Sequence, residues 1–138
     1  MKKFALILIA IVGLAQATFA QQEWKEMDAF HHIMSGTFHP AENGDYKPLR
    51  MKADSLYMAA VTWQKSAIPA TFKEKETKEL LDKLVAETKD IAEANKKGIN
   101  DGDLFVKINN AHDTFHKIVG ECRKDDGHGH GDHDGHGH

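Results

Sequence analysis

Four stretches of the chain carry apolar residues at alternating steps of three and four, and proline or glycine separates them. These steps place the apolar side chains of each stretch on one face of a helix. Pro40, Pro69 and Gly98 are predicted to end the first three helices, and Pro48 suits the first turn of the second. Four amphipathic helices joined by short turns predict an all-α fold, an up-down-up-down four-helix bundle.

Each predicted helix is expected to bury one stripe of side chains against the other helices. Asp101 and Asp103 are expected to cap the start of the fourth helix. The predicted stripes are Trp24, Met27, His31, Met34 and Phe38 in the first helix; Leu49, Ala53, Leu56, Ala60, Trp63 and Ala67 in the second; Leu80, Leu81, Leu84, Val85, Ile91 and Ala92 in the third; and Leu104, Phe105, Ile108, Ala111, Phe115, Ile118, Val119 and Cys122 in the fourth.

The first 20 residues match a secretory signal peptide and are not assigned to the bundle. Two lysines precede a short apolar run, and small residues follow it, as in exported proteins. The run is too short to span a membrane as a helix, and cleavage is expected after Ala17 or Ala20. We therefore expect residues 1–20 to be removed and no membrane span to remain. Bacterial export is expected to place the mature protein in the periplasm, with secretion to the exterior as the less favoured alternative.

The rest of the chain is long enough for one domain but not for two, and we assign residues 21–124 to the bundle. The chain has 18 basic and 21 acidic residues, so the loss of two lysines with the signal leaves a net charge of about −5. A negative charge argues against nucleic acid as a partner, because phosphate binding needs a basic face. The single cysteine, Cys122, cannot form an internal disulfide and is expected to be a small buried hydrophobe.

The composition changes at residue 125, where the sequence DDGHGHGDHDGHGH begins. This tail, residues 125–138, has no apolar residue to bury and is expected to be disordered. Histidines that alternate with glycine and aspartate predict affinity for metal ions without selecting one metal, and the alternative is a solvated terminus without function. Such a tail would raise the ion concentration near the bundle. Its candidate ligands are His128, His130, His133, His136 and His138.

A second group of histidines lies within the predicted helices. His112 and His116 are one helical turn apart, so both imidazoles can reach a single ion. His31 is predicted to face the interior, and His39 is expected to be extended because Pro40 follows it. The first and last helices of an antiparallel bundle are neighbours, so these side chains are expected to meet inside it.

The candidate metal ligands of the bundle have an alternative interpretation, in which hydrogen bonds satisfy each histidine separately. Met34 is favoured as a core residue over a ligand, because methionine commonly fills gaps in cores. The full set of candidate ligands is His31, His32, His39, His112, His116 and Met34.

The helix order and three short segments carry a resemblance to a known family. The segments are a Ser-Ala-Ile-Pro break after the second helix, a Lys-Lys-Gly turn before the fourth, and the Phe115-His116 pair. In these features the chain resembles the haem-carrying four-helix cytochromes, which are cytochrome c-prime and its non-covalent b-type relative. In the b-type relative, a methionine of the first helix and a histidine of the last bind the iron.

The resemblance implies haem b as an alternative cofactor, with His116 and one of Met27, Met34 or His31 as axial ligands. The CxxCH motif is absent, so covalent haem attachment is not expected. Two further segments, TFHP at 37–40 and HDTFH at 112–116, look closer to small exported bacterial proteins of unassigned function that carry TFHP and HDxFH segments.

Three functions remain open from the sequence. The favoured one is periplasmic binding of a transition metal ion, Cu or Zn, for storage, delivery or detoxification, with a metal-transport or redox protein as partner. The alternatives are a b-type haem protein that transfers electrons and a helical module that binds another protein. No nucleophile-base arrangement or phosphate-binding loop is present, so no enzymatic activity is expected. The ligands could come from one chain or two, so a homodimer is an alternative to a monomer.

Overall fold

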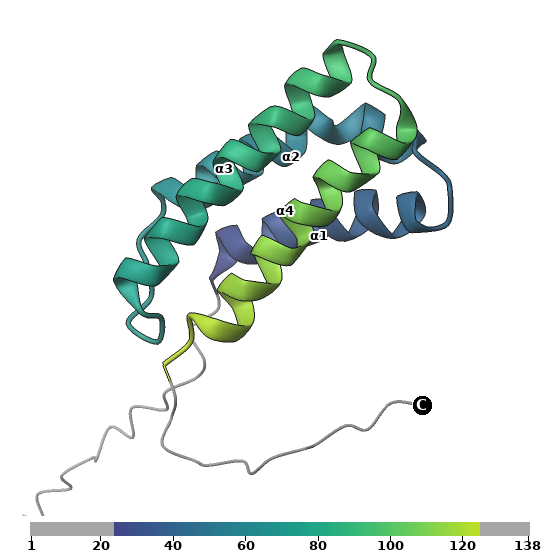
Figure 1. Cartoon of the computed structure of the whole chain (residues 1–138). Coiled ribbons are helices and arrows are strands. Elements are labelled where there is room, and N and C mark those ends of the chain that lie inside the picture. Colours follow the sequence, from purple (N-terminus) through teal and green to yellow (C-terminus); the bar gives the residue numbers. More distant parts are fainter. Residues whose placement is uncertain (1–23, 125–138) are drawn as a thin grey trace, which may run out of the picture.

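A computed structural model describes residues 24–124 and confirms the predicted fold class. Four helices, α1 (Lys25–Glu42), α2 (Lys47–Lys65), α3 (Glu74–Lys96) and α4 (Asp101–Glu121), follow one another in alternating directions (Figure 1). Each helix packs against the next, and α4 closes the bundle by packing on α1, the least extensive of these contacts. The signal peptide and the His-rich tail predicted at the two ends lie outside the described residues.

The described part of the chain has almost no β structure. Between residues 24 and 124 the β-type pairing is limited to one isolated bridge, between Phe72 and Arg123. Among the helices of this same part, none is long and apolar enough to cross a membrane.

The predicted core stripes of α2, α3 and α4 are largely confirmed. On α2 the residues from Leu49 to Trp63 are buried at the predicted steps, whereas Ala67 lies beyond the end of the helix and is exposed. Cys122 is buried as expected, with 1% of its surface exposed. Leu80, Val85, Phe105 and Val119 are half-buried at the edges of the core, and Thr77, Thr88 and Thr114 join it as buried polar residues.

The predicted buried face of α1 is confirmed at Trp24, Met34 and Phe38 and is wrong at His31, which is exposed. The buried residues of the helix are Phe30, Met34, Thr37, Phe38 and Ala41. Neighbouring positions on a helix point about 100° apart, so the buried face includes Phe30 and leaves out His31. Burying the large Phe30 ring is favourable, whereas burying an imidazole costs free energy unless it is hydrogen-bonded. The packing therefore places the phenylalanine inside and the histidine outside.

The predicted end of α1 at Pro40 is also wrong, because the helix continues to Glu42 and His39 is helical rather than extended. Proline removes one backbone donor and crowds the carbonyl four residues earlier, which here belongs to Gly36. Three other bonds close this end: the Asn43 side chain donates to the His39 carbonyl over 2.9 Å, and the Asn43 and Asp45 backbone N–H groups donate to the Pro40 carbonyl. The last turn of α1 therefore remains helical.

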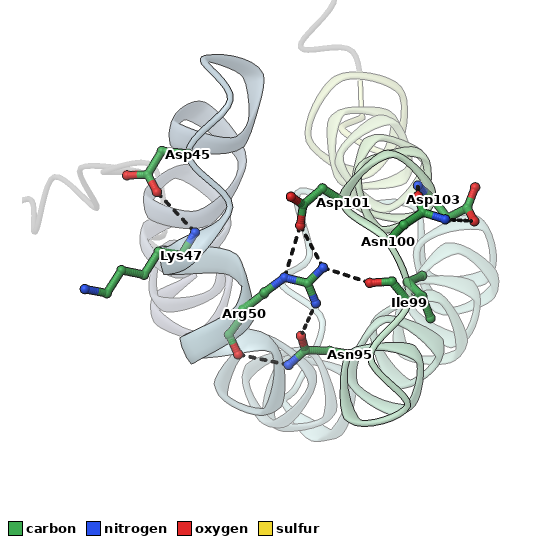
Figure 2. Close-up of polar contacts among 8 residues, drawn as sticks. All are labelled: Asp45, Lys47, Arg50, Asn95, Ile99, Asn100, Asp101 and Asp103. Atoms are coloured by element: carbon green, nitrogen blue, oxygen red, sulfur yellow. Dashed lines mark hydrogen bonds and ion pairs between the residues drawn. The ribbon is translucent and has the colours of Figure 1, made fainter.

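The cap of α4 differs from the prediction by one residue. Asn100 is the N-cap, and its side-chain oxygen accepts a hydrogen bond from the backbone N–H of Asp103 over 2.9 Å. Asp101, which was expected to cap the helix, is its first residue. Its carboxylate instead receives Arg50 of α2, with Nη2 and Nε lying 2.7 and 3.1 Å from Oδ1 (Figure 2).

Arg50 joins three segments at this end of the bundle. Its guanidinium donates to the Asn95 side chain on α3 over 3.2 Å and to the Ile99 carbonyl in the α3–α4 loop over 2.8 Å. The Asn95 amide returns a hydrogen bond to the Arg50 carbonyl over 2.9 Å (Figure 2). The α3–α4 loop is thus fixed to α2 by hydrogen bonds as well as by apolar packing.

Replacing Arg50 with methionine should lower the free energy of unfolding by about 1–2 kcal/mol, because charged hydrogen bonds are lost while the aliphatic stem is kept. Urea unfolding followed by circular dichroism measures the change. Lys96→Met is the matched control, since Lys96 pairs with Asp54 over 3.6 Å between two largely exposed side chains. Its effect should stay within about 0.5 kcal/mol. Equal losses for both variants would contradict the role given to Arg50.

The opposite end of the bundle is filled by aromatic rings. Trp63 lies 5.5 Å from Trp24, 5.4 Å from Phe30 and 6.0 Å from Phe115, measured between ring centroids. Phe72, from the α2–α3 loop, packs on Trp24 at 5.1 Å. All five rings are at least 96% buried. We call these five residues the aromatic cluster.

The chain after α4 is hydrogen-bonded to the α2–α3 loop beside the aromatic cluster. The Lys73 N–H donates to the Cys122 carbonyl over 2.7 Å, and the Lys124 N–H donates to the Thr71 carbonyl over 2.8 Å. The Arg123 guanidinium lies over the Phe72 ring, 5.2 Å from its centroid. These bonds therefore fix the chain up to Lys124.

Candidate metal centre

Two histidines of α4 face each other directly. The Nε2 atoms of His112 and His116 lie 3.0 Å apart, as the helical i, i+4 spacing predicts. His112 is half-buried and His116 is exposed. At 3.0 Å the pair is hydrogen-bonded, so one ring donates and the other accepts. The sequence prediction that these two imidazoles can serve one ion agrees with this geometry.

The distance between the two nitrogens suits a pair of metal ligands. Two imidazole nitrogens bound at about 2.0–2.1 Å lie roughly 3.3–3.4 Å apart in a tetrahedral site. At a right angle, as in tetragonal copper sites, the same bond lengths give roughly 2.8–3.0 Å. The observed 3.0 Å needs a shift of no more than a few tenths of an ångström for either geometry. The spacing of the two nitrogens is therefore compatible with either coordination geometry without refolding of α4.

His112 is held in place by the ring of Phe38 from α1. The two rings are stacked, with centroids 3.8 Å apart and planes 11° from parallel. Phe38 itself is buried and fixed in the core. Stacking on a fixed ring limits the rotation of the imidazole about its side-chain bonds. The Nε2 atom of His112 is therefore held in one orientation.

His39 of α1 lies beside this pair. Its ring centroid is 6.5 Å from that of His112, and its Nδ1 lies 3.0 Å from a carboxylate oxygen of Glu42. A carboxylate that accepts the Nδ1 proton leaves Nε2 as the free donor atom, which is the usual second-shell arrangement around metal-binding histidines. Both His39 and Glu42 are exposed, so a rotation of the His39 side chain is not opposed by packing.

The other predicted ligands lie elsewhere. His31 is exposed and stacks on the Phe115 ring at 5.1 Å, so the expectation that it faces the interior is wrong. His32 is exposed on α1. Met34 is 1% exposed and belongs to the core, whereas Met27 is half-buried at its edge. Of the three α1 histidines, His39 alone is therefore near the α4 pair, 6.5 Å from His112 between ring centroids and on an exposed position, and the predicted meeting of these histidines inside the bundle is wrong.

The described residues bring two imidazole nitrogens together and place a third imidazole nearby. Within residues 24–124, no group of three His, Cys, Asp or Glu side chains is already close enough to hold one ion. The predicted tail histidines lie outside this range. A complete site thus needs either a movement of His39 or donors from beyond the described residues.

Partial burial lowers the pKa of His112 below its ordinary value of 6.5, and the neighbouring His116 lowers that pKa further. The carboxylates of Asp113 and Glu42 act in the opposite direction, and His39 lowers the pKa slightly. The result is an imidazole that stays neutral to lower pH than a free histidine. A neutral imidazole is the form that binds metal ions.

This lowered pKa predicts how stability depends on pH. His112 binds a proton less readily in the folded protein than in the unfolded chain. Its contribution to the free energy of unfolding is therefore complete above pH 6.5. That contribution is lost as the pH falls towards the pKa of His112 in the folded protein. We expect His112→Gln, without metal, to flatten the fall in unfolding free energy between about pH 7 and pH 5. Urea unfolding across this range measures the slope. An unchanged slope in His112→Gln, or an equally flattened slope in the His32→Gln control, would contradict this assignment.

Sequence reasoning missed two residues of this centre. Glu42 follows His39 by three residues, and this i, i+3 spacing on a helix would have indicated their contact had α1 been extended past Pro40. Phe38 was assigned to the core, and nothing in its spacing indicated that its ring would also stack on the imidazole of His112.

No family model, curated protein or solved structure matches this chain. The resemblance to four-helix cytochromes and to small exported proteins with TFHP and HDxFH segments therefore stays a prediction, and function has to be argued from the site itself.

Proposed function

We propose that this protein binds one transition metal ion, copper or zinc, at the α1–α4 seam. His112 and His116 are the primary ligands through Nε2, and His39 is the third, oriented by Glu42. The single observation that carries the proposal is the pair of facing Nε2 atoms 3.0 Å apart on one helix. The chemical support is that imidazole nitrogens suit both copper and zinc.

The ion is favoured over haem by what fills the interior. Phe30, Trp63 and Phe115 lie within 6.0 Å of one another between centroids, in the region where a haem between α1, α2 and α4 would need space. His116, the proposed axial ligand, is exposed, whereas Met34 is buried in the core. A haem held by both would require this packing to open, while an ion needs only rotation of surface side chains.

The biological role follows from the predicted export and from the tail. A signal peptide at residues 1–20 would deliver the protein to the periplasm, where a surface-exposed ion site is accessible to a transport or redox partner. The five histidines of residues 125–138 would add capacity for further ions. Storage, delivery or detoxification of the metal is the function that combines these features.

The proposal is tested on the chain from Gln21 with all five tail histidines replaced by serine, which we call the tail variant. We expect it to bind one Zn(II) or Cu(II) ion per chain in competition with a chelator, with the side-chain nitrogen NMR signals of His112 and His116 shifting on binding. A tail variant that binds neither ion, or whose signals shift elsewhere, would refute the site. Iron with haem in protein isolated from cells without metal-affinity purification would favour the cytochrome alternative.

A further inference from the structure

The facing histidines of α4 can fill two coordination positions of an ion and leave the others to different donors. Zinc in a closed protein site takes four ligands, and the pair supplies two nitrogens 3.0 Å apart. In the part of the chain that the structure describes, no three His, Cys, Asp or Glu side chains are grouped closely enough to hold one ion. His116 is exposed and His112 is half-buried, so an ion at this pair is accessible to donors from another molecule.

A second copy of the chain carries the donors that such an ion needs. Two copies related by a twofold axis through the ion each contribute one His112–His116 pair, because a twofold axis repeats every contact. Four imidazole nitrogens then surround the ion, which is the number that a closed zinc site requires. An axis perpendicular to α4 makes the two α4 helices antiparallel, so that His112 of each copy lies opposite His116 of the other.

The charges beside the pair fit the same antiparallel arrangement. Asp113 and Lys117 each follow one of the two histidines directly, and both are exposed. Within residues 24–124, neither side chain takes part in an ion pair. The axis that places Asp113 of one copy opposite Lys117 of the other is displaced along α4 by a single residue, about 1.5 Å, from the axis that pairs the histidines.

A parallel arrangement of the two α4 helices would instead place Asp113 opposite Asp113 and Lys117 opposite Lys117. Like charges across an interface are repulsive, whereas opposite charges fix its register. This face of α4 is therefore complementary to itself in the antiparallel direction only.

We propose that two copies of this protein share one zinc ion through His112 and His116 of each copy, with their α4 helices antiparallel. The inference rests on the proposed ion site and names a partner for it, a second copy of the chain. Sharing is favoured when chains outnumber ions, because four imidazoles then serve one ion. When ions are in excess, each chain holds an ion of its own, with His39 as the third ligand, and the two copies separate.

The test measures the mass of the tail variant by sedimentation as Zn(II) alone is added. The tail variant is used because its tail offers no histidine to the ion. We expect a monomer without zinc, twice the monomer mass at half an equivalent of zinc, and a return to the monomer when zinc is in excess. A mass that stays monomeric at half an equivalent, or a mass that does not depend on zinc, would overturn the proposal.

Charge variants of the tail variant test the antiparallel register. Asp113→Lys turns two attractive pairs into repulsive ones and should weaken the dimer at half an equivalent of zinc roughly 10-fold. The exchange Asp113→Lys/Lys117→Asp makes the opposing charges opposite again and should restore the dimer. If the exchange variant dimerises as weakly as the single variant, the antiparallel arrangement is wrong. The matched control, His31→Ala/His32→Ala, removes two exposed imidazoles of α1 and should dimerise as the tail variant does.

Three outcomes separate this inference from the site on which it rests. If the tail variant binds one zinc ion per chain at His112 and His116 but stays monomeric at half an equivalent, the ion site stands and only the sharing fails. If it shows neither binding nor a change in mass, both proposals fail. If its mass still doubles after His112→Ala/His116→Ala, the dimer does not depend on the pair, and the shared ion is refuted.

Discussion

Replacing both His112 and His116 with alanine in the tail variant is expected to lower zinc affinity more than about 100-fold. Loss of second-shell partners alone commonly costs 10–100-fold in metal affinity, so removal of two ligands should cost more. The bundle should remain folded, because alanine favours helix and neither histidine belongs to the hydrophobic core. The stacking of His112 on Phe38 is lost, which should cost about 0.5–1.5 kcal/mol. Chelator competition measures affinity, and far-ultraviolet circular dichroism measures helix content.

The matched control for this double variant is His31→Ala/His32→Ala. It removes the same number of imidazoles from exposed positions of α1 while leaving the α4 pair intact. We expect its zinc affinity to equal that of the tail variant. Equal losses in both double variants would mean that binding depends on the number of histidines and not on the facing nitrogens, which would contradict the site.

Replacing Phe30 with alanine should lower the free energy of unfolding by about 3–5 kcal/mol. Phe30 is fully buried and lies 5.4 Å from Trp63 and 5.7 Å from Phe115, so its removal leaves a cavity lined by rings that cannot collapse freely. Native domains have only about 5–15 kcal/mol of stability, and the melting temperature should therefore fall by more than about 10 °C. Urea and thermal unfolding followed by circular dichroism measure both quantities.

His31→Ala provides the comparison that identifies the buried face of α1. His31 is exposed but stacks on the Phe115 ring at 5.1 Å, so its replacement should lower the unfolding free energy by no more than about 1.5 kcal/mol. If His31→Ala proved as destabilising as Phe30→Ala, α1 would have to be rotated by about one residue, and the register expected from the sequence would be restored.

The bundle itself could be predicted because three of its helices have unambiguous stripes. On α2, the steps from Leu49 to Trp63 allow one apolar face, and Pro48 begins the helix where proline is tolerated. On α1, the predicted and observed buried faces share Trp24, Met34 and Phe38, and spacing does not decide between Phe30 and His31 as the further buried residue. The choice depends on the free energy of burying Phe30 against that of burying His31, which is decided by packing against Trp63 and Phe115.

The part of the candidate site that lies within one helix could be predicted from the sequence. The part that depends on contacts between two helices could not. The spacing of His112 and His116 places their nitrogens together on any regular helix. The position of His39 depends on how α1 ends, and the bonds from Asn43 and Asp45 that keep it helical follow from no pattern in the sequence. The contact of Phe38 with His112 depends on how α1 lies against α4, which requires the whole fold.

The aromatic cluster gives the protein an optical signal of its own. Both tryptophans of the chain belong to it, and Phe115 connects it to the proposed ion site, with its ring 6.0 Å from Trp63 and 5.5 Å from His116. Cu(II) at His116 would therefore quench indole fluorescence, which can be recorded without an added label. Zinc has no unpaired electrons and would leave the fluorescence intensity unchanged. Unfolding exposes the same indoles, so emission has to be recorded together with circular dichroism to separate ion loading from loss of structure.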